Sequence, residues 1–145
     1  MANVSGVQQA KKWIYDSLVG DSENNAIVSG RIYADRVPAG TTPVYPYELY
    51  NLMAGTDVQG VGTVRESTSA LFQIRVVTSG SPDTNARKAE YRIDQVLGGA
   101  KNQISGDYMF TSWRTDPVDR AEYDQTQKLY QNIGGLYRLW IQKVA

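Results

Sequence analysis

Four carboxylates lie close together in the last third of the chain, where they could hold a metal ion or act as a general acid and base. They are Asp116, Asp119, Glu122 and Asp124. Paired carboxylates can transfer protons, and their oxygens suit Mg²⁺ or Ca²⁺. Basic residues alternate with them, namely Arg114, Arg120 and Lys128. Neutralisation by these neighbours favours a solvated connection, and a small metal-dependent enzyme is kept as an alternative.

The segment 55–68, GTDVQGVGTVREST, has the glycine content of a phosphate-binding loop. Gly55 and Gly60 have the separation of the two fixed glycines of a P-loop. Val61 and Gly62 occupy the positions that the motif gives to Lys and to Ser or Thr, and a predicted strand follows instead of a helix. The segment is therefore interpreted as a long, mobile hairpin loop.

Composition excludes several further kinds of chemistry. The chain has no histidine and no cysteine, which argues against imidazole bases, thiol chemistry and the common zinc and haem sites. Lys and Arg number 15, as do Asp and Glu, so a basic stripe for nucleic acid is not expected. Tyrosines and the three tryptophans could stack on single-stranded bases, but core and interface positions are favoured. We predict that the protein is not an enzyme and that it binds neither a cofactor nor a metal ion.

Targeting signals are not apparent either. The N-terminal 20 residues lack the apolar core of a signal peptide, and no apolar run is long enough to cross a bilayer. Synthesis in a reducing cytoplasm and no association with a membrane are the expectations.

Hydrophobic spacing predicts two helices. Residues 3–19 carry one apolar stripe, with Asn3 or Ser5 as the cap and Gly20 as the end; the polar run 20–25 then reads as a loop. Residues 82–97 form the second helix, with Ser81 as N-cap and Pro82 as its first residue. Its buried stripe is expected to be Ala86, Ala89, Ile93 and Val96 or Leu97.

Four segments have strand character. Residues 47–53 are rich in tyrosine, and in residues 69–80 Phe72, Ile74 and Val76 alternate with polar residues. Residues 107–116 end at Pro117, and residues 128–144 form a long strand in which Gly134 and Gly135 are interpreted as a bulge. The order α-β-β-α-β-β predicts a single α+β domain over residues 1–145. Its two helices would cover one face of a four-stranded, mainly antiparallel sheet.

The segment 28–47, VSGRIYADRVPAGTTPVYPY, resembles the tail-terminator (tail-completion) proteins of long-tailed bacteriophages. In that family a pattern close to xRIYxDRxPxGTxxPY follows an N-terminal helix and precedes a Tyr-rich strand. The residues that fit are Arg31, Ile32, Tyr33, Asp35, Arg36, Pro38, Gly40, Thr41, Pro46 and Tyr47. The spacer before Pro46 is longer than usual, and the Gly134–Gly135 pair is a second departure.

The resemblance implies a structural protein of the virion. Such proteins form a ring, typically a homo-hexamer, that caps the tail tube, stops its polymerisation and joins the tail to the head-completion or connector protein. DNA passes through the lumen without specific binding. A chain of this length has a diameter of roughly 38 Å, so six subunits leave room for duplex DNA. The alternative within the same class is a head-completion (stopper) or other neck ring protein.

Two segments are candidates for contacts with a neighbouring subunit or partner. The first holds Arg31, Tyr33, Asp35 and Arg36, for which an ordinary loop within one subunit is the competing interpretation. The second is the expected mobile loop, with Asp57, Val58, Gln59, Val61 and Arg65. Residues 55–67 are expected to become ordered against a neighbour or the tail tube, because contacts must offset the entropy that their glycines lose.

Overall fold

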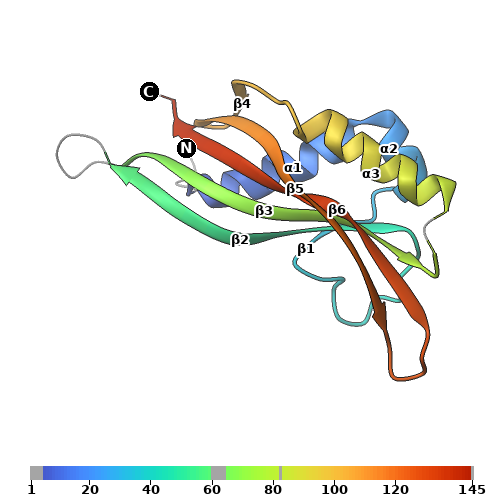
Figure 1. Cartoon of the computed structure of the whole chain (residues 1–145). Coiled ribbons are helices and arrows are strands. Elements are labelled where there is room, and N and C mark those ends of the chain that lie inside the picture. The colour runs from blue at the N-terminus through green and yellow to red at the C-terminus, as the bar shows by residue number, and fades with distance from the viewer. Residues whose placement is uncertain (1–4, 60–64, 82, 145) are drawn as a thin grey trace.

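The computed structural model describes residues 5–59, 65–81 and 83–144 of the chain (Figure 1). Its elements in chain order are α1 (Gly6–Gly20), α2 (Ser22–Val28), β1 (Ile32–Ala34), β2 (Tyr47–Gln59), β3 (Arg65–Ser79), α3 (Thr84–Leu97), β4 (Gln103–Ser105), β5 (Tyr108–Tyr123) and β6 (Leu129–Lys143). The α+β class is confirmed.

The sheet has six strands in the order β1-β2-β3-β6-β5-β4, so the predicted four-stranded sheet is wrong in detail. β1 runs parallel to β2, and every other neighbouring pair is antiparallel. The two extra strands have three residues each and lie at the two edges. Segments this short carry almost no periodicity, so the sequence did not reveal them.

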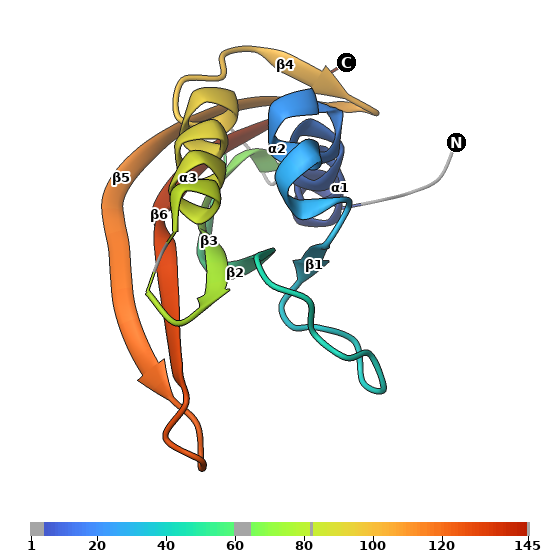
Figure 2. The same cartoon turned by 90° about the vertical axis from the view of Figure 1, so that its right-hand side faces the viewer.

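All three helices cover one face of this sheet, which curls around them (Figure 2). On that inner face, Phe72, Ile74 and Val76 of β3 are fully buried against the helices. Tyr137, Leu139 and Ile141 of β6 and Ala86, Ala89, Ile93 and Leu97 of α3 join the same core. The predicted alternation and helix stripe are therefore confirmed, and the opposite face of the sheet carries no helix.

α1 begins after Ser5, the second of the two predicted caps, and runs from Gly6 to Gly20 instead of over residues 3–19. Ser5 is its N-cap, and the Ser5 hydroxyl accepts a hydrogen bond from the Gln8 amide at 3.3 Å. The loop expected over residues 20–25 is wrong, because α2 begins at Ser22. Asp21 caps α2 through the Asn24 amide at 3.0 Å and also pairs with Arg92 of α3 at 2.7 Å. A seven-residue helix held by tertiary contacts gives no stripe of its own in the sequence.

The second predicted helix starts slightly later than expected. Asp83 is the N-cap of α3, and its side chain accepts from the Ala86 amide at 2.8 Å. Ser81 therefore lies outside the helix, and Pro82 is outside the described residues. Both Ser81 and Asp83 are good capping residues, so spacing alone did not decide between them.

The loop expected over residues 55–68 is mostly strand. β2 and β3 stay paired as far as Gln59 and Arg65, while residues 60–64 lie outside the described part. The Thr68 hydroxyl donates to the Asp57 carboxylate at 2.8 Å across this hairpin. Cross-strand pairing of this kind stabilises polar, glycine-containing strands that propensity alone would reject.

β5 also runs further than predicted, because it continues through Pro117 to Tyr123. β4 pairs only with residues 108–110 of β5, so Pro117 stands on an open edge where its missing amide proton disrupts no ladder. The predicted solvated connection after Asp116 is therefore part of a strand.

β6 is the predicted long strand, but the predicted bulge is not at its glycines. β3 pairs with β6 without interruption, and the register shift lies opposite, between Arg114 and Asp116 of β5. A Cβ on Gly134 would overlap the Ile74 carbonyl oxygen and lie 2.6 Å from the Arg75 Cα. The glycine pair thus allows a close approach of neighbouring strands.

Candidate subunit interface

The four clustered carboxylates do not converge on one point. Arg120 pairs with Glu122 at 3.3 Å, and Asp119 accepts a hydrogen bond from Gln131. Asp124 closes the β5–β6 turn by accepting from the Thr126 and Lys128 amides at 2.8 and 2.9 Å. Within the described residues, no three Asp, Glu, His or Cys side chains are grouped as metal ligands. Asp124 thus stabilises the turn of the β5–β6 hairpin.

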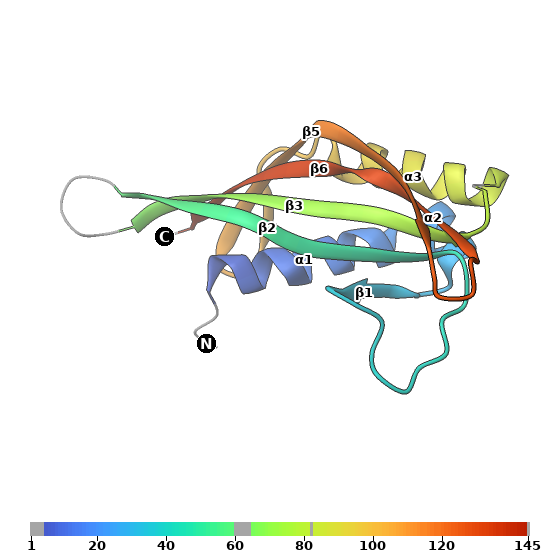
Figure 3. The same cartoon turned by 60° about the horizontal axis from the view of Figure 1, so that its bottom comes forward.

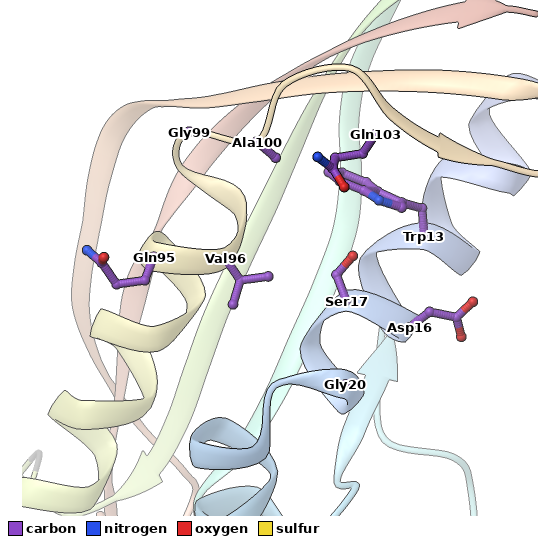
Figure 4. A pocket seen from close by; sticks show the side chains of 9 residues that line it. All are labelled: Trp13, Asp16, Ser17, Gly20, Gln95, Val96, Gly99, Ala100 and Gln103. Carbon is purple, nitrogen blue, oxygen red and sulfur yellow. The ribbon is translucent and has the colours of Figure 1, made fainter.

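A shallow cavity of about 480 Å³ lies between α1, α3 and the approach to β4 (Figure 4). Its lining includes Trp13, Ser17 and Gln103. Its one carboxylate, Asp16, receives a hydrogen bond from Lys12 at 2.6 Å. Among the described residues that line this cavity, Asp16 is the one carboxylate or basic group.

One buried carboxylate is not among the residues that the sequence pattern singles out. Glu48 is fully buried on the inner face of β2, where Asn24 of α2 donates to its Oε1 at 2.8 Å. Burial raises the pKa of Glu48 to about 8, against the lowering effect of the Asn24 hydrogen bond. The Asn24 amide also reaches the Leu18 carbonyl at 3.3 Å, so the pair joins α1, α2 and β2. The sequence does contain one indication of this carboxylate, because Glu48 lies between Tyr47 and Leu49 in a segment with strand character.

Arg31 forms contacts within its own subunit. Its guanidinium donates to the Pro46 carbonyl through Nε at 3.2 Å and Nη2 at 3.1 Å, and to the Ile27 carbonyl at 3.3 Å. The Arg31 carbonyl accepts from the Glu48 amide at 2.9 Å. Arg31 therefore ties the end of α2 to the start of β2.

The three other candidates of this segment are more accessible. Tyr33 meets Tyr47 edge-on with ring centroids 6.0 Å apart. Asp35 adopts a positive φ of 64°, donates its amide to the Tyr50 carbonyl and lies 4.0 Å from the Lys11 ammonium. Asp35 and Arg36 are thus exposed, and Tyr33 is half-buried.

The second candidate group lies at the far end of β2 (Figure 3). Asp57 is held by Thr68, Val58 is 37% exposed, and Gln59 and Arg65 form the last described pair of the hairpin. Val61 lies outside the described residues. Tyr50, the last partner of β1, is separated from Gln59 by roughly 30 Å of strand. The structure does not join the two groups in one site but sets both along the β2 side of the sheet.

Both sides of the sheet have long unpaired edges. In the described chain, no strand pairs with the outer side of residues 51–59 of β2 or of residues 113–123 of β5. The β2 edge carries exposed apolar side chains, with Met53 at 52% and Leu52 at 37%. The β5 edge carries Pro117 and charged residues. Unpaired edges are potential contact surfaces, and both edges carry features that limit indiscriminate strand pairing. On β2 these are Asp57 and the register shift between Leu52 and Ala54, and on β5 they are Pro117 and its charged neighbours.

The fold of this chain is similar to that of a chain in a solved structure. A chain of the solved structure titled "Virion of native gene transfer agent (GTA) particle" superposes with a TM-score of 0.61. The two chains share 18% identity, and the match covers 89% of this chain and 91% of that chain.

Sequence comparison gives the family itself. Residues 12–133 match the family described as "Tail completion protein gp17", so the chain belongs to the tail-completion proteins. No curated protein matches it significantly. A tail-completion protein is a structural component of a virion tail.

None of the described helices is long and apolar enough to cross a membrane.

Proposed function

We propose that this chain is the tail terminator of a phage-like particle and forms a homo-hexameric ring. The ring caps the last ring of tail-tube protein, stops its polymerisation and joins the tail to the head-completion or connector protein. It acts in the virion, at the neck end of the tail, after synthesis in the bacterial cytoplasm. DNA passes through its lumen, and no catalysis is involved. Membership of the tail-completion family supports this proposal.

The observation that carries the ring is the difference between the two open sheet edges. A ring needs a head-to-tail contact, in which one surface of a subunit meets a different surface of the next. The β2 edge has Leu52, Met53 and Val58 exposed, whereas the β5 edge combines charged residues and Pro117 with exposed Trp113 and Tyr123. The two edges lie on opposite sides of the same sheet. Contact between β2 of one subunit and β5 of the next would repeat until the ring closes.

The candidate residues lie near the two ends of β2. Arg31, Tyr33, Asp35 and Arg36 are near its start, and Asp57, Val58, Gln59 and Arg65 are at its other end or at the start of β3, while Val61 is outside the described residues. We propose that both groups face the neighbouring subunit or the tail tube, with Asp35 and Arg36 meeting the charged residues of β5. Arg31 acts indirectly, by fixing the start of β2.

Deletion of the gene from the particle's genome tests the function. The expected phenotype is intact heads separate from tails, with tubes of irregular or excessive length. Complementation with the unchanged chain should restore joined particles. Normal joined particles after deletion would contradict the proposal, and leaking heads with normal, capped tails would assign the chain to the stopper instead.

A pair of matched variants tests the β2 edge. Met53→Glu puts a charge on the apolar edge, while Tyr91→Glu puts the same charge on α3, where Tyr91 is 59% exposed. We expect Met53→Glu to fail in complementation and Tyr91→Glu to succeed, with both chains folded by circular dichroism. Equal complementation by both variants would remove the β2 edge from the interface.

A further inference from the structure

A second cavity lies on the helix-free face of the sheet, beside the starts of β2 and β6. It has a volume of about 240 Å³ and is walled by Tyr45, Tyr47 and Tyr130. The ring centroid of Tyr45 lies 5.4 Å from that of Tyr47 and 5.5 Å from that of Tyr130. We call this the tyrosine cavity. Its lining reaches the open β5 edge through Glu122 and does not include residues 51–59 of β2.

Two hydrogen-bond donors of the tyrosine cavity have no partner in the described chain. Asn132 lines the cavity and is only 3% exposed, and its Nδ2 is unpaired. Arg75 lines it as well, and its Nε is buried and unpaired, while its Nη1 donates to Gln73 at 3.1 Å. Buried donors without acceptors cost free energy, and most buried polar groups in proteins have a partner. The cavity therefore suits an incoming acceptor.

The charge around the tyrosine cavity is positive. Arg75 makes no ion pair with any described residue, and burial lowers the pKa of its guanidinium. The one carboxylate in the lining, Glu122, is 3.3 Å from Arg120. The Lys128 ammonium lies over the Tyr130 and Tyr45 rings at 5.6 and 6.0 Å. Glu122 acts electrostatically on Arg75, but it also pairs with Arg120. Arg75, Arg120 and Lys128 thus outnumber this carboxylate around the cavity.

The shape of the site favours a carboxylate over a DNA phosphate. A carboxylate is flat and can accept two hydrogen bonds from a guanidinium, and a methylene stem can carry it between aromatic walls. A phosphate within duplex DNA is flanked by sugars and cannot reach an amide as deeply buried as that of Asn132. Binding along a phosphate backbone also draws on several basic residues, whereas one of the three here, Arg75, lines the cavity.

We propose that the tyrosine cavity binds the carboxylate of an Asp or Glu side chain from another protein of the particle. Arg75 and Asn132 donate to the carboxylate, and the three tyrosines enclose its stem. The partner would be a tail-tube or connector protein, and this identity alone rests on the proposed function. The chemistry of recognition stands on the residues of the cavity.

Titration of the ¹⁵N-labelled full chain followed by NMR tests this site. The probe is N-acetyl-aspartate N-methylamide, and its control is the isosteric, neutral N-acetyl-asparagine N-methylamide. We expect saturable shifts of the amides of residues 75–77 and 130–132 with the aspartate probe. The asparagine probe should bind at least tenfold more weakly. Equal binding of the two probes, or no saturable shift, would overturn the proposal.

Three variants connect the binding to the named donors. Arg75→Gln and Asn132→Leu should each weaken binding of the aspartate probe at least tenfold. Arg138→Gln, which removes a guanidinium that donates to Ser69 on another part of the same face, should leave it unchanged. Thermal unfolding of each variant shows that it is folded. An Arg138→Gln loss as large as that of Arg75→Gln would contradict the site.

Two further probes distinguish other anions. N-acetylglycine represents a chain-terminal carboxylate, and a 12-base-pair duplex represents DNA phosphate. Arg75-dependent binding of either one more tightly than the aspartate probe would overturn the assignment to an acidic side chain. If the titration fails but particles contain the ring, only the carboxylate site is refuted. If the titration succeeds but the chain is absent from the end of the tail, only the terminator function is refuted.

Discussion

Replacement of Glu48 by glutamine should make the protein more stable at neutral pH. Burial raises the pKa of Glu48 from its ordinary 4.5 to about 8, so the folded state keeps a proton that the unfolded chain has lost. Each pKa unit corresponds to about 1.4 kcal/mol. At pH 7 the buried acid therefore lowers the free energy of unfolding by about 3 kcal/mol relative to a neutral group.

The sign of the pH dependence follows from the same shift. Because the folded pKa is raised, stability is highest below about pH 4.5 and falls as pH rises toward 8. Glu48→Gln keeps the acceptor for Asn24 and removes the titration. The difference in unfolding free energy between Glu48→Gln and the unchanged chain should grow by about 3 kcal/mol between pH 5 and pH 8.

Urea unfolding followed by tryptophan fluorescence at several pH values measures this difference. Glu23→Gln is the matched control, because the Glu23 side chain is 56% exposed and lies 3.8 Å from Arg92. Its curve should stay parallel to that of the unchanged chain. A Glu48→Gln curve that also stays parallel between pH 5 and pH 8 would refute the claim that Glu48 is buried and protonated.

Other substitutions test the fold itself. Gly134→Ala should lower the free energy of unfolding in urea by more than about 2 kcal/mol, because the added Cβ meets the backbone of β3. Gly99→Ala is the control and should change it little, since no atom lies within 4 Å of the added Cβ. Equal effects of the two substitutions would contradict the close approach of β3 and β6 at Gly134. Arg92→Met should lower the free energy of unfolding at pH 7, because it removes both hydrogen bonds to Asp21. The Arg92 hydrogen bond lowers the pKa of Asp21. The stabilisation by this pair is therefore fully present above the ordinary Asp pKa and should vanish as the pH falls below the lowered pKa of Asp21. An effect of Arg92→Met that does not depend on pH would contradict this role of the pair.

The sequence predicts the core well because its pattern there has a single explanation. Phe72, Ile74 and Val76 alternate with polar residues, and the α3 stripe repeats every three or four positions. Both patterns follow directly from burial on one face. The predicted helix layer and the central strands were therefore recovered, and the family resemblance agrees with the matched family.

The edges and the polar helix were not predictable in the same way. β1 and β4 are too short for a period, and α2 depends on Asp21 contacting both Asn24 and Arg92, which is 71 residues away in the chain. Pro117 was predicted to end a strand because proline cannot donate to a ladder within a sheet. The strand order shows that Pro117 lies on an open edge, and the sequence does not contain that information. Asn132 and Arg75 become a candidate site only once β2, β3 and β6 lie side by side.

Cryo-electron microscopy of the intact particle tests the central proposal most directly. The account predicts one ring of six copies between the last tail-tube ring and the connector, with the β2 edge of each copy against the β5 edge of the next. A chain found elsewhere in the particle would contradict the terminator function. A ring at the tail end whose subunits meet through other surfaces would contradict the interface derived from the open edges.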